Sequence, residues 1–400
     1  MSSRLPRPKA VLIVLVPLLL MLALGIWLGG HSQYLPKPVA NTLVGPEDRR
    51  ITLEALDTIH DKYFRPVSQA TLSNDAIAGA VADLHDRFSS YLAPKPYGRF
   101  QLTINNEFSG VGTAVRAAKT GLQIVTVYPK SPAKQAGLRV GDIVTRSNGH
   151  KLAGLTEDAA TALIKGREGS IVTLTLQRGK RTFTRRLTRA RISVPVVSSR
   201  IANAGGKRVA YIALSTFGPD TAHVEVADAI RRLKRRGAKG IVFDLRGNGG
   251  GLVKEAQLIA SMFIAKGPIV TTRGRSVPSE TLNAIGHPIA GNMPTVVLVD
   301  GGTASASEIV SGALQDTKRA KLIGVRTFGK GVFQEIMPLK NGGALDLTVG
   351  QYFLPSGRNL GGPGTKPGQG LKPDVEVRDN PHTKRDEVLA KALHVLAAEL

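Results

Sequence analysis

The chain has 400 residues, a hydrophobic fraction of 42% and a formal net charge of +24, and it contains no cysteine. Its length and hydrophobic fraction are those of a folded protein with two or three domains. The missing cysteine excludes thiol catalysis, disulfides and thiolate metal sites, and the eight histidines show no HExxH or similar pairing, which disfavours a zinc peptidase.

The positive charge does not by itself indicate a nucleic-acid-binding protein. The basic residues are scattered along the chain, and their two small runs lie at 178–186 and 231–236. The second run ends a predicted helix, where cations suit the helix dipole. We therefore favour a solvated basic face, with attraction to an anionic membrane or an acidic partner as the second interpretation. Nucleic acid is the least favoured partner.

The amino terminus is predicted to direct export. Residues 10–30 carry no charge and follow Arg4, Arg7 and Lys9. A helix of this length reaches about 30 Å, the thickness of a bilayer core. Because 1–30 contains no good A-x-A cleavage site, we favour an uncleaved signal anchor in the inner membrane, with the rest of the chain on the periplasmic side. The alternative is a signal peptide that is cleaved, releasing the protein into the periplasm.

Two short regions follow the export segment. Residues 31–46 contain Pro36, Pro38 and Gly45 and are typical of a linker. Residues 47–106 show apolar residues at helical spacing, so we predict a small helical region that packs on the peptidase domain described below.

After Phe108 the apolar residues recur with a period of two, which predicts strands rather than helices. Gly-bounded turns and two helical segments separate these strands. The region 107–190 is therefore expected to be a small domain of short strands with two helices. The predicted strands are 111–115, 121–128, 171–177 and 182–187, and the longer helix is 156–165.

Residues 191–380 alternate between short apolar runs and amphipathic helices. Such runs are typical of buried parallel strands, and strand–helix–strand order predicts an α/β domain. Residues 342–354 add a stretch with strand character, and 381–400 are expected to form a helical tail. The predicted strands are 209–214, 240–245, 295–299 and 321–325, and the predicted helices are 220–235, 252–263 and 308–314.

Ser305 stands between a buried strand and a helix, in the sequence PTVVLVDGGTASASEIV. The pattern S-x-x-E from Ser305 to Glu308 is a capping box, and capping is the more frequent role for a serine at this position. A hydroxyl at a helix start also has the next backbone N–H, that of Ala306, beside it to stabilise an oxyanion. The spacing G-x-S-x-G is absent, which makes an α/β-hydrolase triad improbable.

Lys330 lies between two glycines in FGKGVFQEIMPL. Period two places it on one face with Val332 and Gln334, where burial would lower the pKa of its amine. A neutral lysine can accept a proton from a serine, and Gln334 could orient it. On the residues alone, a surface lysine hydrogen-bonded to a glutamine is the commoner arrangement.

The motifs GTASASE, TFGKGVFQ and FDLRGNGGG, in the order and spacing found here, resemble the carboxyl-terminal processing peptidases of the S41 type. The resemblance covers about residues 47–377 and departs from many relatives at Asp300, where they carry asparagine. It implies an α/β, crotonase-like Ser–Lys peptidase domain. It also implies that Ser305 is the nucleophile, Lys330 its general base and Gln334 the residue that orients the base, with Ala306 and Gly251 forming the oxyanion hole.

The segments EFSGVG, SPAKQAGLRVGDIVTRSNG and TEDAATALIKG together resemble a PDZ domain. In that family the loop matching Gly110, Val111 and Gly112 presents N–H groups to the terminal carboxylate of a peptide, which adds as a strand to the sheet edge. The fold expected for the whole chain is thus a multidomain mixture of α/β and α+β elements.

The combined prediction is a serine endopeptidase that takes exported or membrane proteins by their free carboxyl termini and cleaves them through an acyl-enzyme, without metal or cofactor. An adaptor protein and a homo-oligomer are further candidate partners. The alternative function is a catalytically silent PDZ adaptor or sensor at the membrane.

Overall fold

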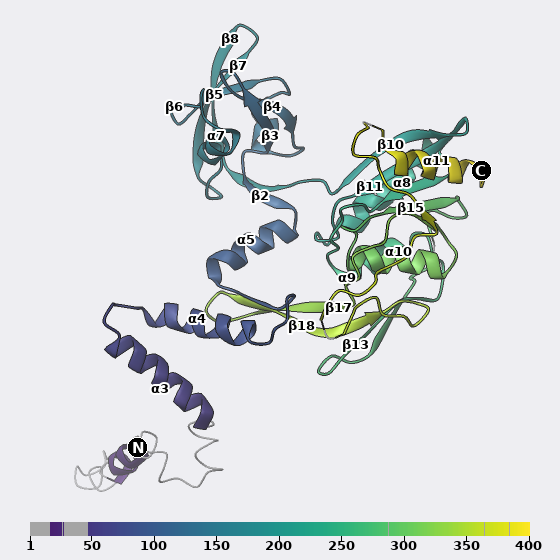
Figure 1. Cartoon of the computed structure of the whole chain (residues 1–400). Helices are drawn as coiled ribbons and strands as arrows, with labels where there is room; N and C mark the ends of the chain where they lie inside the picture. The colour runs from purple at the N-terminus through teal and green to yellow at the C-terminus, as the bar shows by residue number, and fades with distance from the viewer. Residues whose placement is uncertain (1–16, 26, 28–46, 287, 364, 384) are drawn as a thin grey trace, which may run out of the picture. The chain divides into compact units, whose positions relative to one another are not determined.

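The computed structural model describes residues 17–25, 27, 47–286, 288–363, 365–383 and 385–400 (Figure 1). The predicted linker 31–46 and most of the predicted export segment 1–30 lie outside these residues. Among the helices within the described ranges, none is both long enough and apolar enough to span a bilayer. The chain divides into two compact units, Met1–Asp83 and Leu84–Leu400.

In the first unit, two helices occupy the start of the predicted helical region. Helix α3 covers Glu47–Lys62 and has acidic residues in its first turn and basic residues in its last, as the helix dipole favours. Helix α4 covers Gln69–Ala82, and the hydroxyl of Ser68 caps it by accepting a hydrogen bond from the Thr71 N–H.

The prediction of a helical region that continues to residue 106 is wrong at one point. Strand β1, Ser90–Leu92, interrupts it before helix α5, Pro94–Ile104. This strand pairs with β18, Ala344–Phe353, so that Ser90 stands opposite Asp346. Three residues are too few to show a period of two, and the partner strand is remote in the sequence.

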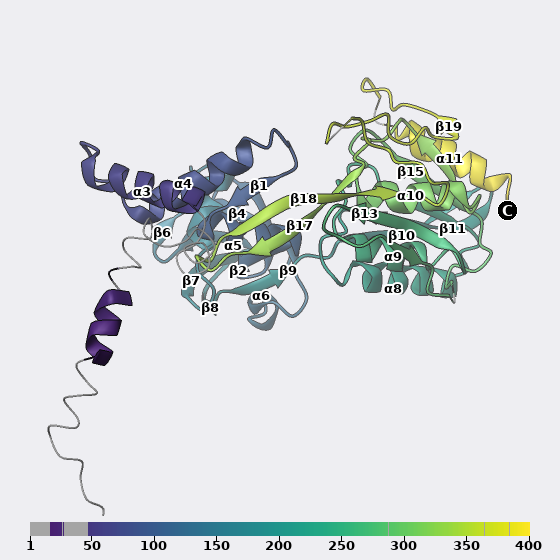
Figure 2. The same ribbon diagram turned by 90° about the horizontal axis from the view of Figure 1, so that it is seen from below.

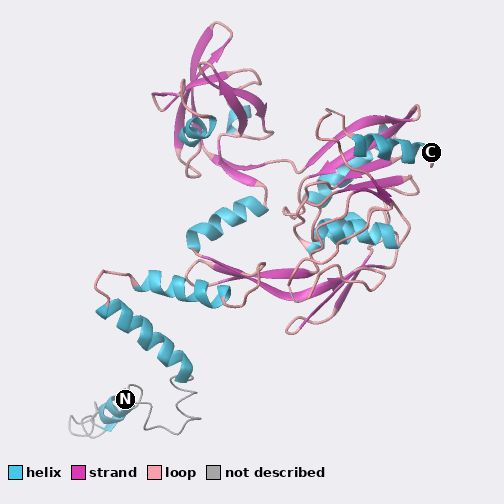
Figure 3. Ribbon diagram, viewed as in Figure 1, coloured by secondary structure: helices cyan, strands magenta, loops and turns pink. Residues whose placement is uncertain are grey.

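The region from β2 to β9 contains a small antiparallel sheet with two helices (Figure 3). The sheet order is β3-β4-β5-β7-β8, so β3 is an edge strand. Leu122, Ile124 and Leu174 lie in its buried core. The elements are β2 Glu107–Gly110, β3 Thr113–Ala118, β4 Gly121–Val127, α6 Pro132–Gln135, β5 Ile143–Ser147, β6 His150–Lys151, α7 Glu157–Ile164, β7 Ile171–Arg178, β8 Arg181–Thr188 and β9 Ala190–Ser193.

A second sheet has the order β10-β11-β12-β15-β16-β19, and all its pairs except β10 with β11 are parallel. Every residue of β12 and β15 is buried, as expected for central strands covered on both faces. The strands are β10 Val197–Ala204, β11 Lys207–Leu214, β12 Ile241–Asp244, β15 Thr295–Val299, β16 Lys321–Gly324 and β19 Val375–Glu376.

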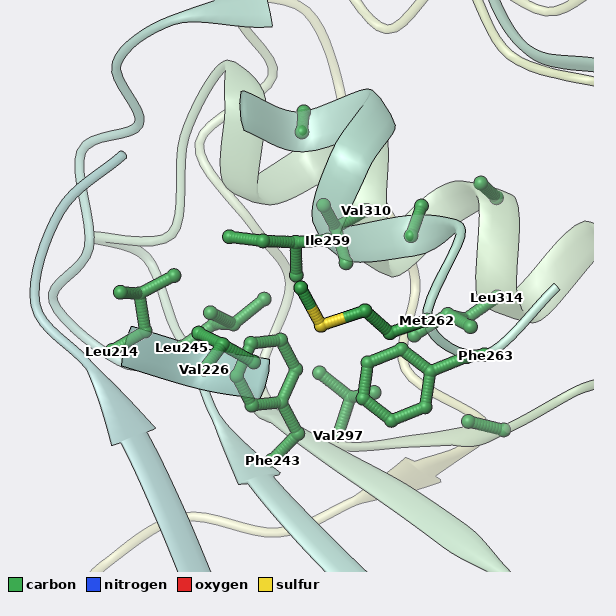
Figure 4. Close-up of a cluster of buried hydrophobic side chains, with 14 of the residues drawn as sticks. Leu214, Val226, Phe243, Leu245, Ile259, Met262, Phe263, Val297, Val310 and Leu314 are labelled. Atoms are coloured by element: carbon green, nitrogen blue, oxygen red, sulfur yellow. The ribbon is translucent and has the colours of Figure 1, made fainter. Parts of the chain in front are cut away.

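Helices cover both faces of this parallel sheet. Phe243 and Val297 point into a core shared with α8 (Ala222–Arg235), α9 (Val253–Ala260) and α10 (Ala306–Asp316), as Figure 4 shows in part. The alternate residues Val242 and Val296 pack with Val388, Ala392 and Leu396 of α11, Glu387–Ala397. The segment predicted as a helical tail is therefore one layer of the fold.

An antiparallel sheet carries the remaining strands, in the order β1-β18-β13-β14 with β17 also paired to β18. Figure 2 shows β17, Val332–Pro338, running beside β18. Neither β13, Pro268–Gly274, nor β14, Glu280–Asn283, was expected from the sequence. Lys330 lies in the turn that leads into β17.

Candidate active site

Ser305 occupies a strained turn between β15 and α10. Its backbone has φ 57° and ψ −118°, a conformation that costs a residue other than glycine about 1–3 kcal/mol. The preceding turn is fixed by Asp300, whose Oδ1 accepts hydrogen bonds from the N–H groups of Gly247 (2.8 Å) and Gly302 (2.9 Å). The carboxylate at position 300 therefore serves the turn geometry. Such strain is typical of positions that the surrounding structure holds for function.

The glycine turn after β12 lies directly against Ser305. A Cβ on Gly250 would be 2.8 Å from the Ser305 Cβ, and a Cβ on Gly251 would be 2.2 Å from the carbonyl carbon of Phe217. Close backbone approach therefore requires both glycines. The Gly250 N–H donates to Asn248 Oδ1 at 2.9 Å.

Two backbone N–H groups at this turn remain available for a substrate oxyanion. Among the hydrogen bonds of the described residues, none uses the N–H of Gly251 or of Ala306 as donor. Ala306 is also the first residue of α10, where the helix dipole favours negative charge. Both groups therefore fit the oxyanion role that the family resemblance implies.

Glu308 connects the serine to the lysine, a role that sequence reasoning missed. One oxygen of its buried carboxylate, Oε2, accepts from the N–H of Ser305 (2.9 Å) and from the N–H of Lys330 (3.0 Å). The other, Oε1, accepts from the Thr327 hydroxyl (2.6 Å) and the Gly329 N–H (2.7 Å). Burial raises the pKa of Glu308, and these four hydrogen bonds oppose that rise. The only signal in the sequence was the S-x-x-E pattern.

The amine of Lys330 is largely removed from water. This burial lowers its pKa, while the nearby carboxylates of Asp346, Asp86 and Glu308 partly counteract the effect. The Nζ donates to Gln334 Oε1 at 2.6 Å and lies 4.8 Å from the ring centroid of Phe88. The structure thus brings the predicted Lys330 and Gln334 together.

The backbone of Lys330 is hydrogen-bonded on both sides of its Cα. Its N–H bonds to Glu308 and its carbonyl accepts from the hydroxyl of the buried Tyr352. No hydrogen bond joins the Ser305 Oγ to the Lys330 Nζ, two atoms that the structure does describe. Catalytic hydrogen bonds often form only when substrate is bound, so a base need not contact its nucleophile in the free protein.

A lysine base predicts activity that rises with pH, and the lowered pKa of Lys330 brings this rise closer to neutral pH. Only the neutral amine accepts a proton, so kcat/KM should be low below the folded-state pKa of Lys330 and should rise as pH passes through it. The measurement is the rate of hydrolysis of an unfolded substrate from mildly acidic to alkaline buffer, with circular dichroism to confirm the fold. A rate that falls between neutral and mildly alkaline pH in the folded protein would contradict this assignment.

The predicted peptide-binding loop lies between β2 and the edge strand β3. The carbonyls of Val111 and Gly112 accept from the N–H groups of Ala133 (2.8 Å) and Tyr128 (3.0 Å). No hydrogen bond among the described residues uses the N–H of Val111 or Gly112. Gly112 has φ 85°, and a Cβ there would be 2.2 Å from the Ser131 Cβ. Gly110 ends β2 and stands opposite Ala190.

Two regions of the chain match known family descriptions. Residues 208–377 match peptidase family S41, and residues 123–178 match the PDZ domain. These matches bear out the predicted resemblance and the mixed α/β, multidomain fold class.

Similar proteins are found among bacterial proteases. The chain is 33% identical over 361 residues to the carboxy-terminal processing protease CtpA of Bacillus subtilis strain 168, covering 90% of this chain and 76% of that protein. It is 33% identical over 321 residues to a CtpA-like serine protease of Staphylococcus aureus strain bovine RF122 / ET3-1, covering 80% of this chain and 62% of that protein's length.

A solved structure shares the fold. The S41 protease from Bacteroides fragilis NCTC 9343 aligns with a TM-score of 0.50 and 20% identity, over 85% of this chain and 92% of that one.

Proposed function

The chain belongs to peptidase family S41, and on this premise we propose that it is a Ser–Lys endopeptidase of the carboxyl-terminal processing type. The observation that carries the proposal is the Glu308 carboxylate, which holds the backbones of Ser305 and Lys330 on one oxygen atom. A strained serine and a desolvated lysine amine, whose backbones are tied together in this way, supply a nucleophile and a base for it.

The chemistry follows from these positions. Lys330 accepts the proton of the Ser305 hydroxyl as its oxygen attacks the scissile carbonyl, and the N–H groups of Ala306 and Gly251 stabilise the oxyanion of the tetrahedral intermediate. Lys330 then protonates the leaving amine, which leaves an acyl-enzyme on Ser305. In the second half of the reaction Lys330 removes a proton from water, which hydrolyses the ester.

Substrates are unfolded or extended protein segments with a free carboxyl terminus. The N–H groups of Val111 and Gly112 are free to bind a carboxylate, and β3 offers an unpaired edge to which a peptide adds as a further strand. The uncharged segment 10–30 supports a place at the inner membrane with the catalytic domain on the periplasmic side. A cleaved signal peptide, an adaptor protein and a homo-oligomer are further proposals compatible with the same sequence.

A pair of substrates that differ only at the carboxyl terminus tests the proposal. The full chain should cleave an unfolded peptide with a free terminus faster than its amidated form, because an amide has no negative charge for the loop. The Ser305→Ala variant should cleave neither. Equal turnover of the two forms by the wild type would remove terminus recognition from the proposal.

Two glycines provide a matched pair of variants for the same assay. Gly112→Ala should abolish the preference for the free acid, since its Cβ would meet Ser131. Gly154→Ala carries a similar backbone strain, at φ 82°, but its Cβ meets nothing within 4 Å, so the preference should survive. If wild type and Ser305→Ala were equally inactive toward every substrate, a silent PDZ adaptor would be the better description.

A further inference from the structure

A chain of polar contacts continues from Lys330 beyond Gln334. The amine donates to Gln334 Oε1 at 2.6 Å, and Gln334 Nε2 donates to the hydroxyl of Thr348 at 2.9 Å. Gln334 and Thr348 stand opposite each other in the β17–β18 ladder, immediately after a bulge at Phe333. The carboxylate of Asp86, in the loop ahead of β1, lies close enough to the Thr348 hydroxyl for that hydroxyl to help lower its pKa.

The far end of this chain is fixed by the same loop. Ser89 Oγ donates to Asp86 Oδ2 at 2.6 Å and accepts from the backbone N–H of Thr348 at 3.0 Å. The Phe88 N–H donates to Asp86 Oδ1 at 3.0 Å. Burial raises the pKa of Asp86, but the hydrogen bonds from Ser89 and the Phe88 N–H, together with the nearby hydroxyls of Thr348 and Thr365, outweigh it, so the pKa is lowered. Asp86 is therefore ionised at neutral pH.

An ionised carboxylate sets the direction of every bond in the chain. A carboxylate only accepts hydrogen bonds and attracts the positive end of a nearby hydroxyl dipole, so Asp86 turns the Thr348 proton toward itself and leaves lone pairs of Thr348 for Gln334. Gln334 must then turn its NH₂ group to Thr348 and its oxygen to Lys330. With the amide reversed, the NH₂ group would donate to the lone pair of the neutral amine, and that lone pair is the one required for the Ser305 proton.

We propose that Asp86 and Thr348 are positioning residues that lock the Gln334 amide with its oxygen toward Lys330, so that the amine's lone pair stays available to Ser305. This proposal rests on the proposed Ser–Lys mechanism. Three other groups face the amine: the charges of Asp346 and Glu308, and the ring of Phe88, which lies against it. None of the three is hydrogen-bonded to Gln334. The lock therefore depends on Thr348.

The test is a Thr348→Val substitution in the full chain. Valine keeps the branched shape on the strand but cannot hold the amide, so kcat should fall about tenfold or more with KM unchanged. Because a reversed amide favours the neutral amine, the acidic limb of the kcat/KM profile should also move to lower pH. A purely structural defect would lower the plateau and leave that limb in place. Thr348→Ser, which restores the hydroxyl, should recover both quantities.

Matched variants decide between the lock and a general effect of losing a hydroxyl. Thr281→Val removes a strand hydroxyl of the same sheet, whose partner is Thr271, and should leave kcat and the pH limb unchanged. Asp86→Asn should lower kcat as Thr348→Val does. Only kcat is compared for this variant, because loss of the Asp86 charge lowers the pKa of Lys330 directly. A Thr348→Val enzyme within about twofold of wild type, with an unmoved limb, would overturn the proposal.

A second readout separates this proposal from the proposed function. Trace labelling with acetic anhydride over a range of pH, with the Lys330 peptide quantified by mass spectrometry, reports the pKa of that amine without any substrate. The pKa should be lower in Thr348→Val than in the wild type. If the wild type hydrolyses nothing, the proposed function fails, yet an identical Lys330 titration in the two proteins would still overturn the lock.

Discussion

Replacing Lys330 by methionine should reduce kcat for peptide hydrolysis by about 10⁴-fold or more, to the level of Ser305→Ala, because a nucleophile and its base act as a unit. Methionine fills much of the space of the lysine stem without a proton acceptor. The Lys330 backbone contacts to Glu308 and Tyr352 do not involve the amine, so the fold should survive. The measurements are kcat on an unfolded substrate and the melting temperature of each variant.

An exposed lysine of the same hairpin provides the control. Lys340 lies in the turn between β17 and β18, and Lys340→Met should retain wild-type activity. Alanine at any single histidine should likewise leave hydrolysis largely intact, since none of the histidines that the structure describes belongs to the site. A correctly folded histidine variant that no longer forms the acyl-enzyme would show that the lysine is not the base.

Replacing Glu308 by glutamine should damage both stability and catalysis. All four partners of the carboxylate are donors, so the NH₂ group of glutamine must face two of them in either orientation. A buried group that loses its acceptor costs about 1–3 kcal/mol. Where the lost pair is Ser305 and Lys330, the nucleophile and base are no longer held together, and displacements near 1 Å cost about 10²-fold in rate.

The control for this variant must lose hydrogen bonds between a carboxylate and backbone N–H groups away from the site. Glu225 on α8 accepts from the N–H groups of Val196 (2.9 Å) and Val197 (3.1 Å), so Glu225→Ala should lower the free energy of unfolding while kcat per folded molecule stays near that of the wild type. For Glu308→Gln, kcat per folded molecule should fall steeply. Should the two variants lose activity only in proportion to their unfolded fractions, Glu308 would be a purely structural residue.

Local patterns in the sequence were sufficient for the α/β part of the fold. The buried strands β12 and β15 are apolar except for one polar residue at an end, Asp244 in β12 and Thr295 in β15. A neighbouring helix such as α8 has a clear apolar stripe. Each of these signals lies within one element, so no knowledge of its partners was needed. The motifs around Ser305 and Lys330 were likewise continuous in the chain, and their resemblance to a family named both residues.

The second sheet and the supports of the site depended on contacts between distant segments. Strand β1 is three residues long and exists because β18 pairs with it, and β13 and β14 give only weak local signals. Glu308 is indistinguishable in sequence from an ordinary capping residue. Only folding places its carboxylate under the backbone of Lys330 as well as that of Ser305.

The sequence by itself therefore determined the order of the domains, the parallel sheet and the candidate nucleophile, base and orienting glutamine. The tertiary structure alone decided which groups hold them. Hydrogen-bond direction and the pKa of a buried group depend on every donor, acceptor and charge around it, and those neighbours come from separate elements. For Lys330 they are Glu308 on α10, Thr348 and Asp346 on β18, and Asp86 in the loop before β1, which no periodicity within a single segment could bring together.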